Sequence, residues 1–181
     1  SPLHLDDGSY YRILERAGEV GATVFVHAEN GEILDFLRRE CIKKGQTAPK
    51  YHYISRPPFT EAEGVRRAAY LAGKVGTPVY IAHVTCREAL KELIEARGNG
   101  VNINGETCTH YLTITKDVLD NPDFNEASKY VCSPALRDQE DIDALWDALN
   151  RGILTAVSSD HCGIDVAELK QAGRDDFTQI P

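Results

Sequence analysis

The sequence contains no methionine, a single tryptophan and no Cys-x-x-Cys pair among its 181 residues. Without such a pair a structural zinc knuckle is not expected, and five scattered cysteines favour a cytoplasmic protein with reduced thiols. The lack of an initiator methionine, the abrupt start at Ser1 and the end at Pro181 together predict an internal segment of a longer polypeptide.

An excess of basic charge and long apolar runs are also missing. The net charge is −8 and the pI is about 5.2, which leaves no electrostatic footprint for nucleic-acid binding. No stretch approaches the roughly 20 apolar residues of a membrane helix, and the first residues lack the features of a signal peptide. The remaining composition, 42% hydrophobic and 27% charged, is that of a soluble globular domain.

Helical and strand-like patterns alternate along the chain. Short apolar runs at 23–26, 78–82, 101–106 and 153–157 are separated by helical periodicity at 32–44, 60–75, 87–96 and 138–150, and another helix is expected at 7–20. This alternation is typical of parallel βα units and predicts an α/β fold. Four units fit half of a (β/α)8 barrel or a small doubly wound sheet, and the pattern alone does not choose between them.

Local signals refine these elements. The two prolines in residues 51–58 predict an irregular loop, and Thr60 with Glu63 suggests a capping box at the start of the next helix. Trp146 is expected in the core of the last helix. Arg56 is expected on a solvated face or at a contact between subunits.

Three of the predicted strands end in residues that could bind a metal. His27, His83 and Asp160 each follow an apolar run, and the carboxyl ends of parallel strands share one edge. Two neutral imidazoles and a carboxylate suit zinc, manganese or iron, and an aspartate beside a metal-bound water can accept its proton. His161 would point away from Asp160, and Glu106 could be a ligand or a structural carboxylate.

Several motifs together resemble the dihydropyrimidinase and hydantoinase family of the amidohydrolase superfamily. The resemblance covers nearly the whole chain in the same order. It rests on residues 26–31 (VHAENG), 83–86 (HVTC), 105–112 (GETCTHYL), 132–137 (CSPALR) and 159–162 (SDHC).

The resemblance implies a fold, a reaction and roles for individual residues. The fold is a partial (β/α)8 barrel in which residues 1–181 form the central to C-terminal part of one metal-dependent hydrolase domain. The reaction is the reversible hydrolytic opening of a cyclic diamide such as dihydrouracil or a hydantoin. His27 and His83 match ligands of one metal ion, Asp160 matches a ligand of the other and the proton shuttle, and Ser133 matches a residue that contacts the ring amide.

The family pattern also implies parts that this sequence lacks. Full-length relatives use two divalent ions, usually zinc, bridged by a carboxylated lysine, and commonly assemble as homotetramers. The lysine, a His-x-His pair and an oxyanion-stabilising tyrosine are expected before Ser1. We therefore expect the isolated chain to be inactive. Gly163 stands where many relatives carry proline.

Other functions remain open at this stage. Allantoinase and dihydroorotase share the barrel and the pattern of metal ligands, although the motifs at 132–134 and 160–162 favour the pyrimidine and hydantoin branch. A collapsin response mediator-like protein would keep the fold as a non-catalytic assembly partner, but such relatives have lost metal ligands that stand here. A small, unrelated α/β domain binding one ion is the third alternative.

Overall fold

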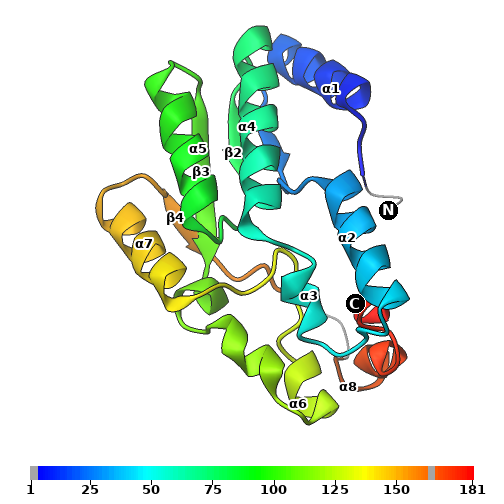
Figure 1. Cartoon of the computed structure of the whole chain (residues 1–181). Coiled ribbons are helices and arrows are strands. Elements are labelled where there is room, and N and C mark those ends of the chain that lie inside the picture. Colours follow the sequence, from blue (N-terminus) through cyan, green and yellow to red (C-terminus); the bar gives the residue numbers. More distant parts are fainter. Residues whose placement is uncertain (1–3, 163–165) are drawn as a thin grey trace.

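The computed structural model describes residues 4–162 and 166–181, so Gly163 lies outside the described part. Its central feature is a sheet of four parallel strands (Figure 1). The strands are β1 (Val24–Val26), β2 (Val79–Ile81), β3 (Ile103–Cys108) and β4 (Ala156–Ser158). Their order in the sheet is their order in the chain, with Val24 opposite Val79, Val79 opposite Ile103, and Glu106 opposite Ala156. The predicted α/β alternation is confirmed.

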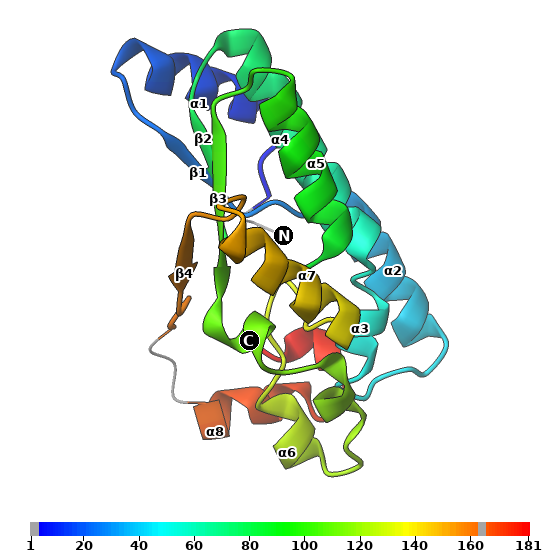
Figure 2. The ribbon, with the colours of Figure 1, turned by 90° about the vertical axis from the view of Figure 1, so that its left-hand side faces the viewer.

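Helices connect the strands and cover one face of the sheet. Figure 2 shows the strands on one side of the molecule and helices α4, α5 and α7 on the other. The helices are α1 (Asp7–Glu19), α2 (Gly31–Lys43), α3 (Tyr51–Ile54), α4 (Pro58–Val75), α5 (Arg87–Gly98), α6 (Phe124–Ser128), α7 (Gln139–Asn150) and α8 (Val166–Leu169). Short 3-10 turns lie at Thr109–Leu112, Lys116–Asp120, Lys170–Gly173 and Phe177–Gln179.

The main core lies between the sheet and helices α4 and α5. Helix α4 contributes small side chains, including Ala68 and Ala72, which let it lie close to the strands and to α5. Val79 and Ile81 of β2 and Leu93 of α5 are almost completely buried. Each such side chain stabilises the fold by about 1.5–3 kcal/mol through burial. This packing fixes the sheet edge from which the candidate ligands extend.

The other face of the sheet is only partly covered in the described part of the chain. Phe25 of β1 is 63% exposed there and stacks on Tyr80 of β2, with ring centroids 5.3 Å apart. Tyr80 in turn donates a hydrogen bond to Glu106 of β3, which also accepts one from Ser158 of β4. The strands are thus joined by side-chain contacts on this face as well as by backbone hydrogen bonds.

Three local expectations were wrong. Residues 51–54 form a helical turn, because both prolines lie after it, and Pro57 and Pro58 start α4, where the first turn tolerates proline. Thr60 donates to the carbonyl of Pro57 and makes no capping box with Glu63. Trp146 is 48% exposed, and its indole N–H donates to the carbonyl of Leu112.

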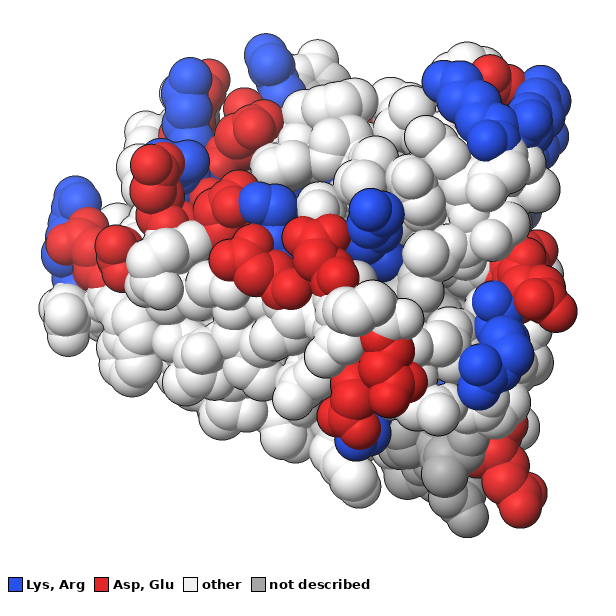
Figure 3. Space-filling model, turned by 60° about the horizontal axis from the view of Figure 1, so that its bottom comes forward, with Lys and Arg blue, Asp and Glu red and all other residues white. Residues whose placement is uncertain are grey.

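The surface carries charges of both signs side by side. Figure 3 shows acidic residues next to basic residues in most of the charged groups, with wide uncharged areas between these groups. Among the residues that the structure describes, no helix is both long and apolar enough to cross a membrane.

Thr107 provides a test of the core. Its hydroxyl is fully buried on β3 without a hydrogen-bond partner among the described residues. We expect Thr107→Val to raise the free energy of unfolding by about 1 kcal/mol, because valine has the same shape and removes an unsatisfied polar group. The matched control is Thr77→Val, which deletes a buried hydroxyl that donates to the carbonyl of Leu14 at 2.8 Å. Urea unfolding should show opposite signs for the two variants, and a destabilised Thr107→Val would contradict this account.

Candidate active site

The candidate ligands lie at the C-terminal edge of the sheet, as the sequence predicted. His27 directly follows β1, and His83 and Asp160 each stand two residues after β2 and β4. Both His83 (φ 36°) and Asp160 (φ 45°) adopt the left-handed backbone region. This conformation is uncommon for residues other than glycine and often occurs at functional sites, where surrounding contacts hold it in place.

The imidazoles of His27 and His83 face each other. Nδ1 of His27 lies 2.9 Å from Nε2 of His83, and the ring centroids are 4.6 Å apart in an edge-on arrangement. His83 is buried, whereas the side chain of His27 is 47% exposed. Burial and the facing His27 ring lower the pKa of His83 to about 4, and the nearby Asp160 carboxylate opposes that shift. His83 is therefore neutral at physiological pH, as a metal ligand must be.

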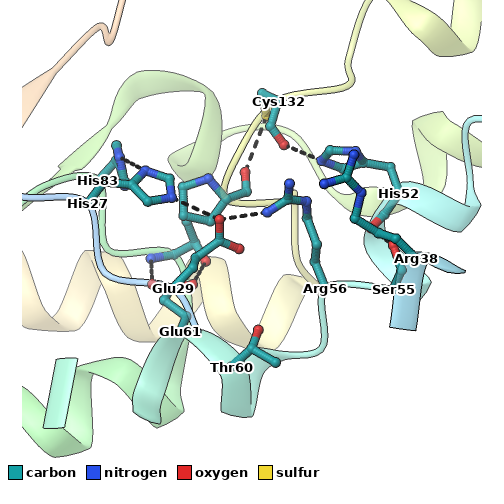
Figure 4. Close-up of polar contacts among 12 residues, drawn as sticks. His27, Glu29, Arg38, His52, Ser55, Arg56, Thr60, Glu61, His83 and Cys132 are labelled. Atoms are coloured by element: carbon teal, nitrogen blue, oxygen red, sulfur yellow. Dashed lines mark hydrogen bonds and ion pairs between the residues drawn. The ribbon is translucent and has the colours of Figure 1, made fainter. Parts of the chain in front are cut away.

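Glu29 orients His27, a role that the sequence reasoning missed (Figure 4). Its Oε2 lies 2.9 Å from Nε2 of His27 and 2.7 Å from Nη1 of Arg56. Burial raises the pKa of Glu29, but the hydrogen bond from His27 and the charge of Arg56 outweigh burial and lower the pKa to about 2. The ionised carboxylate can only accept, so His27 donates from Nε2. In the neutral imidazole this leaves the Nδ1 lone pair directed at His83.

This geometry fits a divalent metal ion at the two histidines. Two ligands bound to one ion at about 2.0–2.1 Å in a tetrahedral arrangement stand about 3.3 Å apart, close to the separation of these nitrogens. A ligating histidine usually donates its other N–H to a carboxylate, as His27 does to Glu29. Within the described residues, however, no group of three His, Cys, Asp or Glu side chains is arranged to hold an ion. His27 and His83 would supply two ligands of such a site.

Ser133 shares a cavity with His27. The cavity has a volume of about 700 Å³, and its lining includes Glu29, Arg56 and Arg38. Arg56 was expected on a solvated face or at a contact between subunits, but its side chain is only 12% exposed and pairs with Glu29. The arrangement places a serine hydroxyl, an imidazole and an arginine along one hollow.

Glu106 proves to be structural, and Cys86 is unreactive. Glu106 accepts hydrogen bonds from Ser158 at 2.8 Å and from Tyr80 at 3.3 Å, which agrees with the structural alternative. Cys86 is fully buried, and burial holds the pKa of its thiol well above the usual value, so it is not a nucleophile.

His52 holds the segment that carries Ser133. Its Nε2 donates to the carbonyl of Cys132 at 2.7 Å, and Tyr111 donates to the carbonyl of Pro134 at 2.6 Å. Both donors are buried. The backbone on each side of Ser133 is therefore fixed by a side chain from another part of the chain.

Comparison with known proteins identifies the relatives of this chain. A D-hydantoinase from Ralstonia pickettii is 48% identical over 98% of the chain. The crystal structure of a dihydropyrimidinase from Brevibacillus agri superimposes on 99% of the chain with a TM-score of 0.96 and 45% identity. This chain belongs to the hydantoinase and dihydropyrimidinase family. It spans about 38% of the length of the curated hydantoinases it matches, and 39% of the dihydropyrimidinase structure.

Relatives with another printed activity are also found. An allantoinase from Bacillus licheniformis is 36% identical over 88% of the chain, which spans 34% of that protein. No family model matches the sequence. The order of these identities places this member of the family nearer to hydantoinases than to allantoinases.

Gly64 of α4 provides a test of how the loop that carries His27 is positioned. A Cβ at this position would lie 2.7 Å from the backbone carbon of Ala28 and 2.8 Å from the nitrogen of Glu29. We expect Gly64→Ala to lower the free energy of unfolding by about 1–3 kcal/mol, because backbone must move to make room. The control is Gly98→Ala at the end of α5, where a Cβ meets nothing within 4 Å. Chemical denaturation of both variants tests this, and equal stabilities would contradict the close approach of α4.

The buried His52 predicts a pH dependence of stability. Burial and the Arg56 charge lower its pKa to about 3. The unfolded chain therefore binds this proton more readily, and the contribution of neutral His52 is lost as the pH falls from about 6.5 toward 3. We expect a slope of about 1.4 kcal/mol per pH unit in that window, which His52→Gln removes. His161→Gln, at an exposed imidazole, is the control. Unfolding at several pH values would show identical slopes for wild type and His52→Gln if this account were wrong.

Proposed function

We propose that the polypeptide containing this chain hydrolyses a cyclic amide, a hydantoin or a dihydropyrimidine, to an N-carbamoyl amino acid. The observation that carries the proposal is the facing pair of imidazole nitrogens on His27 and His83, with Nε2 of His27 held by Glu29. The similarity to D-hydantoinases and dihydropyrimidinases over 98–99% of the chain supports the same reaction class.

The finer parts of the proposal concern the barrel and its metals. The four parallel strands would form half of a (β/α)8 barrel, with the face that carries Phe25 and Tyr80 turned to its interior. His27 and His83 would bind one of two divalent ions, zinc by preference, and Asp160 would bind the other. The remaining ligands, including a carboxylated lysine, would come from outside this chain. The full-length polypeptide would assemble as a homotetramer in the cytoplasm.

The residues of this chain would divide the chemistry among them. A bound divalent ion would act as a Lewis acid on the ring carbonyl. Asp160 would accept a proton from the attacking water and deliver it to the ring nitrogen as the carbon–nitrogen bond breaks. Ser133 would contact the ring amide and orient the ring. Glu29 would keep the Nδ1 lone pair of His27 directed inward.

Allantoin is the second candidate substrate, since an allantoinase matches at 36% identity. It is also a cyclic amide and would require the same groups. A non-catalytic assembly protein of the same fold remains the alternative from another class, and a metal assay separates it from the enzymes. Retention of His27, His83 and Asp160 supports the enzyme.

The test is hydrolysis by the polypeptide at the full length of its relatives, loaded with Zn²⁺ and supplied in turn with hydantoin, dihydrouracil, allantoin and dihydroorotate. We expect turnover of hydantoin or dihydrouracil, and a loss of about 10²–10⁴-fold in kcat for Asp160→Asn, because the proton shuttle is removed. His161→Gln is the matched control on the neighbouring exposed side chain.

Two outcomes would contradict the proposal. One is no hydrolysis of any of the four rings by the zinc-loaded polypeptide. The other is an Asp160→Asn variant as active as His161→Gln. The 181-residue chain alone should show no turnover, since it supplies only some of the ligands, and measurable hydrolysis of dihydrouracil by it would refute that part.

A further inference from the structure

A buried arginine contacts the loop that follows β2 directly and is linked to the loop that follows β1 through Arg56. Arg137 is 5% exposed, and its Nε donates to the hydroxyl of Thr85 at 3.0 Å. Its Nη2 pairs with Glu61 at 3.1 Å, and its Nη1 donates to the carbonyl of Arg56 at 2.5 Å. Every nitrogen of the guanidinium therefore has a partner, and the three partners lie on different parts of the chain.

The first contact leads to His83. Thr85 follows His83 by two residues and is bound twice to Glu61, by its backbone N–H at 2.8 Å and by its hydroxyl. His83 itself adopts a left-handed backbone conformation that is unfavourable outside glycine, so adjacent contacts must hold it. Glu61 and Arg137 supply those contacts, because they fix Thr85 from two sides.

The second contact leads to His27. Arg137 holds the backbone of Arg56, and the Arg56 side chain donates to Glu29 at 2.7 Å. The same carboxylate oxygen of Glu29 accepts from Nε2 of His27. This chain of contacts determines which nitrogen of His27 faces His83. One guanidinium thus lies behind both imidazoles and touches neither.

We infer that Arg137 is a positioning residue for the two-histidine metal site. The site requires its planar guanidinium, because three nitrogens in a fixed geometry bind three separate partners. The inference rests on the proposed function, because it takes His27 and His83 as ligands of one ion. Lysine keeps the charge and can pair with Glu61, but a single ammonium cannot reach Thr85, Glu61 and the Arg56 carbonyl in the same geometry. Substitution of residues that orient metal ligands typically weakens metal binding 10- to 100-fold.

The experiment compares Arg137→Lys with Arg97→Lys in the full-length polypeptide. Arg97 also bonds backbone carbonyls, those of Ile103 and Ile153, but at the opposite end of the strands. The apparent Zn²⁺ affinity is measured by competition with a chelator, and the melting temperature is measured on the same metal-free preparations. We expect both variants to lose melting temperature. Only Arg137→Lys should bind Zn²⁺ 10- to 100-fold more weakly.

A second variant keeps the test decisive if Arg137→Lys does not fold. Thr85→Val removes the hydroxyl between Arg137 and Glu61 at constant shape, and Thr107→Val is its control at a buried hydroxyl without a partner among the described residues. We expect weaker Zn²⁺ binding for Thr85→Val alone.

The outcomes separate this inference from the proposed function. Zn²⁺ affinities of Arg137→Lys and Thr85→Val within twofold of their controls would overturn the inference, whether or not hydantoin is hydrolysed. Weaker Zn²⁺ binding in a polypeptide that hydrolyses no cyclic amide would support the inference and refute the function. If His27→Asn does not change Zn²⁺ affinity, no ion is held there and both are refuted.

Discussion

The site depends on the close contact between the first turns of helix α4 and the loops that follow β1 and β2. Gly64 lets the helix lie against the backbone of Ala28 and Glu29, and the carbonyl of Thr60 accepts from the N–H of Asn30 at 2.9 Å. Glu61, the residue after Thr60, binds the loop that carries His83. A single helix therefore sets the positions of two strand-end loops relative to each other. Parallel strands bring these loops to one edge, and α4 determines their spacing.

The two imidazoles occupy different environments although they face each other. His83 is buried, and burial keeps it neutral, whereas His27 is half-exposed and is oriented by an ionised carboxylate. Burial keeps the His83 ring neutral, and the exposed His27 ring gains its direction from Glu29. Desolvation and hydrogen bonding, two separate physical effects, thus prepare the two nitrogens for the same kind of contact.

The sequence predicted those features that depend on local pattern. The alternation of strands and helices follows from periodicity, and the strand-end placement of His27, His83 and Asp160 follows from where apolar runs stop. Glu29 and Arg137 were missed for different reasons. No residue pattern shows that the Glu29 carboxylate meets His27, two residues earlier, and the contacts with Arg56 and Glu61 join residues 27 to 81 positions apart. The only signal for them was their presence in the segments 26–31 and 132–137, which carried the family resemblance.

The sheet also has a consequence for how the chain acquires its structure. Within the described residues, every strand is hydrogen-bonded to the strand that precedes or follows it in the sequence, and none is inserted between earlier ones. Each βα unit can therefore dock on the unit made before it, without waiting for a distant segment to emerge during synthesis. The loops closed at each step stay short compared with the whole chain, which keeps the entropy cost of each step small. Such a topology allows vectorial folding, with the newest strand always serving as the template for the next.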